Sequence, residues 1–127
     1  MNGILIVGLG GFIGAAARHL MGGWVLHHTL QERFPFSTFA VNVLGCLVAG
    51  VLAGGVERYD WFTPQTRLFL FTGILGGFTT FSAFGIDAMF LLRRSEPWVA
   101  AAYLGGTVAA GVLAVWLGMR AVALLGR

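Results

Sequence analysis

Residues 73–85 read GILGGFTTFSAFG and lie within the third of four long apolar segments. Glycine, threonine and serine are weak helix formers, and hydroxyl groups compete for backbone hydrogen bonds, so we predict that a helix breaks here. Irregular backbone at membrane depth is tolerated only where it is buried in protein or lines a cavity. The break would free carbonyl oxygens around Gly76 to Thr79 for a hard cation such as Na⁺, and Thr80 and Ser82 could cap the following helix. The alternative is a glycine kink that only improves packing.

The composition of the chain is that of a membrane protein. Of its 127 residues, 57% are hydrophobic and 10% are charged, whereas about 25% of a soluble domain is charged. Four apolar segments are each long enough to cross a bilayer as a helix, and they cover about residues 3–26, 36–56, 68–92 and 97–119. We therefore predict one all-α integral membrane domain over residues 1–127, with four transmembrane helices and the third broken at mid-membrane.

The arginines do not favour one orientation of these helices. If the segments alternate in direction, the two sides of the membrane carry similar numbers of arginines, and the chain has no lysine. One side has Arg33, Arg93 and Arg94, and the other has Arg58, Arg67, Arg120 and Arg127. The positive-inside rule then gives no preferred direction. Two interpretations remain: a chance balance in a small protein, or dual topology, in which both orientations insert and form an antiparallel dimer.

The first segment contains a pattern similar to a dinucleotide-binding turn. Residues 4–7 read ILIV and are followed by Gly8, Gly11 and Gly14. The amphipathic helices and further strands of such a domain are missing from the rest of the sequence, so we interpret these glycines as a helix face that packs closely on another helix. No constellation of catalytic side chains is present either. We expect neither an enzyme nor a nucleic-acid partner.

Polar and aromatic side chains in the later segments recur at helical spacing, so each set shares a helix face. The sets are Thr38 with Asn42, Phe81 with Phe84 and Asp87, and Tyr103 with Thr107 and then Gly111. Phenylalanines at this spacing are usually core or lipid-facing residues, but their ring edges can also line a path for an anion. Neutral donors dominate and only one acid lies in the segments, which favours a small anion. Arg18, within the first segment, could partner carbonyls at the break.

The run from Gly73 to Phe84, with Val41 and Asn42 upstream and Arg18 in the first segment, resembles the Fluc (CrcB-type) fluoride channels of microbial membranes. The resemblance covers essentially the whole chain in length, number of segments and order of motifs. It implies a multi-pass channel of the cell (inner) membrane that exports cytoplasmic fluoride by passive conduction. It also implies a dual-topology antiparallel homodimer in the lipid bilayer, with two pores and a central structural Na⁺.

The resemblance also assigns roles to individual residues. The positions that match the fluoride pore are Phe81, Phe84, Asn42, Ser82, Thr38, Tyr103 and Thr107. The positions that match the sodium ligands are the backbone carbonyls of Gly76 and Thr79, and structural roles fall to Arg18 and Thr80. Two positions depart from the family pattern. Gly111 stands where family members have a further hydroxyl, and Asp87 stands where they often have glutamate, so the polar track could be interrupted or wetter at one end.

Two other functions suit a four-span chain of this length. A small multidrug-type, proton-coupled exporter needs a membrane carboxylate that exchanges protons for a cationic drug. The first segment has no acid, and Asp87 in the third is a poor substitute. A noncatalytic assembly or accessory membrane protein would show no ion flux at all.

Overall fold

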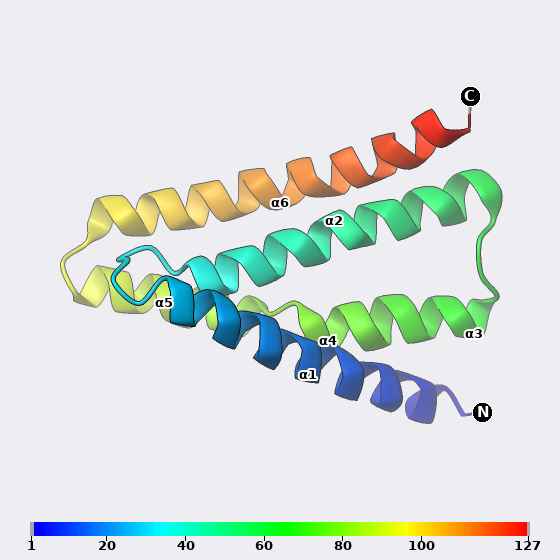
Figure 1. Cartoon of the computed structure of the whole chain (residues 1–127), viewed down its shortest axis with the longest axis horizontal. Helices are drawn as coiled ribbons and strands as arrows, with labels where there is room; N and C mark the ends of the chain where they lie inside the picture. Colours follow the sequence, from blue (N-terminus) through cyan, green and yellow to red (C-terminus); the bar gives the residue numbers. More distant parts are fainter. Residues whose placement is uncertain (1, 127) are drawn as a thin grey trace.

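The structure is a computed structural model that describes residues 2–126, and within this range it is all-helical (Figure 1). Four of its helical elements are long and apolar enough to cross a membrane, and they span Gly3–His28, Phe36–Tyr59, Pro64–Arg93 and Pro97–Leu125. The all-α class and the four spans are therefore confirmed. The helices extend slightly beyond the predicted apolar segments.

Three of the four spans are single helices: α1 (Gly3–His28), α2 (Phe36–Tyr59) and α6 (Pro97–Leu125). The third span is composite. It consists of α3 (Pro64–Arg67), the π-helical segment η1 (Leu68–Leu75), α4 (Gly76–Phe78) and α5 (Phe81–Arg93). Proline occupies the first helical position of both α3 and α6, where its missing N–H has no helical partner to lose. The predicted break is therefore present, between α4 and α5.

The helices run in alternating directions (Figure 1). The α1–α2 and α5–α6 connections lie at one end of the molecule, and the start of α1, the α2–α3 connection and the end of α6 lie at the other. The division of the arginines between two membrane sides assumed these alternating directions.

α2 and α6 pack side by side along a seam in which glycines replace side chains. A Cβ at Gly50 would lie 2.8 Å from the carbonyl carbon of Val115, and one at Gly118 would lie 2.6 Å from the amide nitrogen of Val51. Both distances are too short for a real contact, so the two backbones touch directly at these points. We refer to this contact as the α2–α6 seam.

α1 packs in the same way against the first half of the third span. A Cβ at Gly73 would lie 2.9 Å from Cα of Gly10, and one at Gly14 would meet the backbone of Ile74. The predicted packing face of Gly8, Gly11 and Gly14 is partly wrong, because a Cβ at Gly8 would meet no atom within 4 Å. Gly10 and Gly14 form the contact face instead, four residues apart on one side of the helix.

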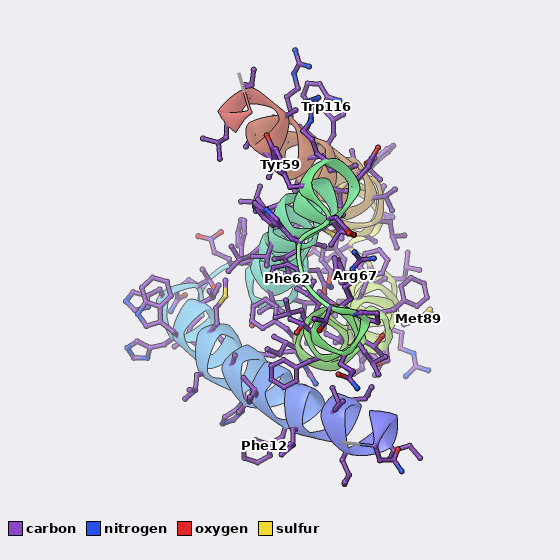
Figure 2. All side chains as sticks on the ribbon, turned by 90° about the vertical axis from the view of Figure 1, so that its right-hand side faces the viewer. Phe12, Tyr59, Phe62, Arg67, Met89 and Trp116 are labelled. Carbon is purple, nitrogen blue, oxygen red and sulfur yellow. The ribbon has the colours of Figure 1, made fainter. Side chains whose placement is uncertain are left out.

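Most large apolar side chains point outward, as expected for a protein surrounded by lipid. Ile4 is 80% exposed, Phe12 is 75% exposed and points away from the other helices, and Trp98 is 86% exposed (Figure 2). The buried cluster is small and lies between α5 and α6, with Phe84 and Tyr103 as its aromatic members. This cluster adjoins the break in the third span and fixes the position of the residues described next.

Candidate functional site

The third span is interrupted at Thr79 and Thr80, close to its middle. The backbone of both residues is extended, with φ and ψ of −86° and 154° at Thr79 and −147° and 119° at Thr80. The Thr80 hydroxyl accepts a hydrogen bond from the amide of Ala83 at 3.2 Å and so caps α5. The Ser82 hydroxyl lies 3.2 Å from the Thr80 hydroxyl and bonds no backbone amide, so Thr80 alone forms the predicted cap.

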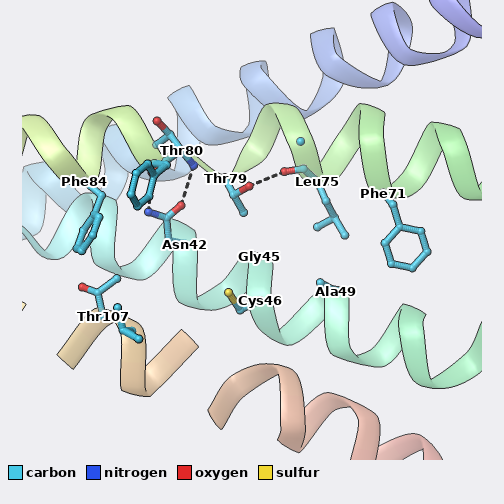
Figure 3. Close-up of a pocket in the computed structure, with 13 residues that line it drawn as sticks. Asn42, Gly45, Cys46, Ala49, Phe71, Leu75, Thr79, Thr80, Phe84 and Thr107 are labelled. Atoms are coloured by element: carbon cyan, nitrogen blue, oxygen red, sulfur yellow. Dashed lines mark hydrogen bonds between the residues drawn. The ribbon is translucent and has the colours of Figure 1, made fainter. Parts of the chain in front are cut away.

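Asn42 of α2 clamps the break through both ends of its amide group (Figure 3). Its Nδ2 donates to the Thr80 carbonyl at 2.9 Å, and its Oδ1 accepts from the Thr80 amide at 2.8 Å. A primary amide has two N–H donors, so one donor is not used by the clamp. Gly45, one turn further along α2, permits this close approach, because a Cβ there would overlap the methyl group of Thr79.

Arg18 reaches the opposite side of the break from α1. Its Nε donates to the Gly77 carbonyl at 3.0 Å, and the Thr79 hydroxyl donates to the Leu75 carbonyl at 2.9 Å. Among residues 2–126, no donor bonds the carbonyls of Gly76 or Thr79. These two oxygens are therefore the ones that the break leaves available to a ligand.

Aromatic rings form a continuous column that starts at the break. The ring centroids of Phe81 and Phe84 are 5.7 Å apart, those of Phe84 and Tyr103 are 5.1 Å apart, and those of Tyr103 and Phe34 are 5.3 Å apart. Phe84 is 8% exposed and Tyr103 is fully buried, whereas Phe81 is 83% exposed. The column thus has a fixed inner part and one open ring at its edge.

A cavity of about 470 Å³ lies beside the break and the open end of this column (Figure 3). Its walls include most of the predicted site residues: Asn42, Gly76, Thr79, Thr80, Phe81, Phe84 and Thr107. The Thr107 hydroxyl is buried and has no hydrogen-bond partner within the described part of the chain. Because an unpartnered buried hydroxyl costs free energy, this group points to a polar ligand, water or partner chain at the cavity.

A second cavity, of about 330 Å³, lies near the α1–α2 connection and is lined by Thr38 and Asp87 among others. The buried Tyr103 contacts a wall residue of each cavity, since its ring packs on Phe84 and its hydroxyl donates to Asp87 Oδ2 at 3.1 Å. The Asp87 carboxylate is therefore partly satisfied within the chain. The structure brings Thr38, Asp87 and Tyr103 into one polar group.

Four predicted site residues line neither cavity: Gly111, Ser82, Arg18 and the fully buried Tyr103. Gly111 belongs to the α2–α6 seam, where a Cβ would lie 3.4 Å from Cys46 Sγ. Ser82 is exposed on α5. Arg18 lines a separate cavity of about 320 Å³, together with Thr38 and Thr80. The structure therefore separates Ser82 from the pore-lining set with which it was grouped.

Two contributors to the site were missed from the sequence. Phe34 lies in the α1–α2 connection and packs edge-on against Tyr103, with an interplanar angle of 89°. No periodicity identifies a connector residue, so only its aromatic character could have marked it. Gly45 follows Asn42 by three residues and shares its helix face, which is a signal that the sequence did contain.

The four spans, with the interrupted third span and the cavities beside its polar break, are those of a multi-pass membrane protein. The chain belongs to the CrcB family, since the family model described as CrcB-like protein, Camphor Resistance (CrcB), matches residues 5–119. The predicted family is thus confirmed.

Three similar proteins align with this chain over nearly the full length of both. The chain is 47% identical to the fluoride-specific ion channel FluC of Methylobacillus flagellatus, over 96% of this chain and 95% of that protein. It is 42% identical to the protein of the same name from Rhizobium meliloti, over 94% of each chain. It is 43% identical to that of Chlorobium chlorochromatii, over 91% of this chain and 88% of that protein.

Proposed function

We propose that this protein is a fluoride-selective channel that conducts fluoride passively across the membrane. The observation that carries the proposal is the Thr107 hydroxyl, buried without a partner in a cavity that also holds the Asn42 amide and the two rings of Phe81 and Phe84. The names of the relatives, fluoride-specific ion channels, support the same ion.

The chemistry of this cavity suits fluoride better than larger halides. Fluoride is small and strongly hydrated, so it passes a membrane only where close hydrogen-bond donors replace its water. The Asn42 amide has a free N–H, and the Thr107 hydroxyl is a free donor. The edges of aromatic rings carry the positive end of the ring quadrupole and attract an anion. The same donors would approach a larger halide less closely, so they would offset a smaller part of its dehydration free energy.

The conduction path in this proposal follows the aromatic column. Fluoride occupies the cavity beside the break, passes the edges of Phe81 and Phe84, and continues past the Tyr103 hydroxyl to Thr38 in the second cavity. Asp87 lies at that end, and its bond with Tyr103 holds the carboxylate to one side. Asp87 and Thr38 thus form the outer limit of the path.

We further propose that the Gly76 and Thr79 carbonyls hold a structural Na⁺. Hard cations prefer oxygen ligands, and unwound backbone in membrane helices supplies carbonyls to Na⁺. Both carbonyls lack an internal donor, and among residues 2–126 no group of three or more acidic, histidine or cysteine side chains offers another metal site. A bound cation would lower the free energy of an anion nearby in low dielectric. The thermal midpoint of the purified protein should be higher in sodium chloride than in N-methylglucamine chloride, and equal midpoints would refute the site.

We propose that the functional unit is an antiparallel homodimer with two pores, formed by two copies inserted in opposite orientations. The balance of arginines between the two ends supports dual insertion. Phe81 supports a partner at the cavity, since its ring is 83% exposed at the cavity wall and a second copy would cover it. Two copies would also supply four free carbonyls to one cation. A single cysteine is introduced at one end of the molecule or at the other, and intact cells are treated with a thiol label that does not cross the membrane. Both variants should be labelled in part, because each end faces outward in one of the two orientations.

The first experiment is fluoride efflux from liposomes that contain the purified protein, measured with a fluoride electrode beside a chloride-loaded sample. Rapid fluoride release without chloride release is the expected result. No release from liposomes that contain folded dimer would overturn the channel proposal. Binding of a drug cation that depends on Asp87 would then support the exporter instead.

A further inference from the structure

The end of the α2–α6 seam holds a charged cavity that the fluoride path does not use. It has a volume of about 500 Å³ and lies between the last turns of α2 and α6. Its charged wall consists of Glu57 and Arg58 from α2 and Arg120 from α6, with Trp116 beside them.

The two arginines of this cavity are not committed to other groups. Arg18 bonds the Gly77 carbonyl, Arg33 pairs with Glu96 at 3.4 Å, and Arg67 pairs with Asp60. In contrast, neither Arg58 nor Arg120 forms an ion pair or a hydrogen bond with any residue between 2 and 126, including Glu57. Two free guanidinium groups and one free carboxylate therefore face a single space.

The location of the cavity identifies its surroundings. It lies at the ends of two membrane-spanning helices, and Trp116 is 56% exposed there. Tryptophan is enriched where the hydrocarbon meets the headgroup layer, and basic pockets between helices at this level bind lipid headgroups. The ligand available at this depth is therefore a phospholipid.

We propose that this cavity binds the headgroup of a phospholipid that carries a phosphate and a primary ammonium group, as phosphatidylethanolamine does. Arg58 and Arg120 bind the phosphate, because guanidinium forms charge-assisted and bidentate hydrogen bonds with phosphate oxygens. Glu57 accepts hydrogen bonds from the ammonium group. A choline headgroup has no N–H and cannot donate to Glu57, and a glycerol headgroup leaves the carboxylate without a cation. This site is independent of fluoride conduction.

The test is lipid binding to the delipidated full-length protein in detergent, measured by native mass spectrometry. Phosphatidylethanolamine, phosphatidylglycerol and phosphatidylcholine with the same acyl chains are compared. We expect phosphatidylethanolamine to bind about tenfold more tightly than phosphatidylcholine, the effect of one additional hydrogen bond to a charged group. Equal affinity for these two lipids would overturn the proposal.

Three variants separate this site from general surface charge. The double variant Arg58→Gln/Arg120→Gln should weaken phosphatidylethanolamine binding about tenfold or more. The double variant Arg93→Gln/Arg94→Gln removes the same charge from the opposite end and should leave binding unchanged. An equal loss in both would mean a nonspecific electrostatic effect and would overturn the proposal.

The variant Glu57→Gln should reverse the preference between two lipids, a result that a loss of folding would not produce. Without the carboxylate, the cavity carries two positive charges, so the preference should reverse in favour of the anionic phosphatidylglycerol. An unchanged preference would contradict the role of Glu57 and refute the proposed headgroup. Soluble phosphoethanolamine serves as the second arm, and displacement of the lipid at equimolar concentration would show that the ligand is a soluble phosphate compound rather than a lipid.

Discussion

α2 and α6 meet through their backbones, whereas the break in the third span is held by side chains. At the α2–α6 seam, Gly50 and Gly118 bring main-chain atoms into contact over unbroken helices. At the break, the Asn42 clamp and the Arg18 bond to Gly77 replace the missing helical hydrogen bonds. The seam therefore depends on shape, and the break depends on a few polar groups, so substitutions in the two regions should have different consequences.

The largest effect is expected from Gly50→Val in the seam. The added side chain would overlap the Val115 backbone, and overpacking at a rigid contact typically costs about 1–3 kcal/mol, with more where backbone must move. We expect a large loss of monodisperse protein in size-exclusion chromatography and a strongly lowered thermal midpoint. Gly105→Val on α6 is the matched control, because a Cβ at Gly105 would meet no atom within 4 Å. Similar midpoints for the two variants would show that the seam is not limited by shape.

Asn42→Asp should have the opposite profile: a folded protein that does not conduct. Aspartate keeps the acceptor for the Thr80 amide but loses the donor to the Thr80 carbonyl, and it places a negative charge in the cavity. A like charge about 4 Å from the ion costs about 4 kcal/mol near a protein surface, which corresponds to a rate loss of about a thousandfold. Fluoride efflux from liposomes measures the loss, and size-exclusion chromatography checks assembly. Normal efflux would exclude the cavity beside Asn42 from the path.

The two phenylalanines of the column allow a sharper comparison. Phe81→Ile and Phe84→Ile should each reduce fluoride efflux about tenfold, since each removes the positive ring edge from the path. Phe84→Ile should also lower the free energy of unfolding, by roughly 1–2 kcal/mol, because Phe84 is buried within its own chain, where the Phe81 ring is 83% exposed. Equal efflux from wild-type and both variants would remove the aromatic column from the mechanism.

The difference between the two regions also explains how far the sequence could predict the structure. The four spans, the break and its position follow from apolar length and from the weak helix formers at residues 76–82. The close packing of α1 was predicted correctly at Gly14 but not at Gly8, whose place Gly10 takes, because all these residues are small and only the partner helix selects among them.

The polar groups were harder to place. The spacing of Tyr103 and Thr107 predicts one shared stripe, but the bond between Tyr103 and Asp87 turns that part of the stripe toward a different cavity from Thr107. Phe34 could not be predicted, since its contact with Tyr103 depends on how the α1–α2 connection folds back over the helices.

The smallest effect is expected at Thr107, where a single substitution removes a polar group and keeps the shape of the side chain. Valine has almost the same shape as threonine, so Thr107→Val removes only the hydroxyl that lacks a partner. If that hydroxyl serves only the passing ion, its removal relieves a desolvation penalty, and the thermal midpoint should stay the same or rise slightly. Fluoride efflux should fall about tenfold or less, the effect of one lost hydrogen bond. Stability and conduction would then change in opposite directions. A lower midpoint together with normal efflux would mean that the hydroxyl bonds a partner chain or a structural water, and that it belongs with the clamp rather than with the path.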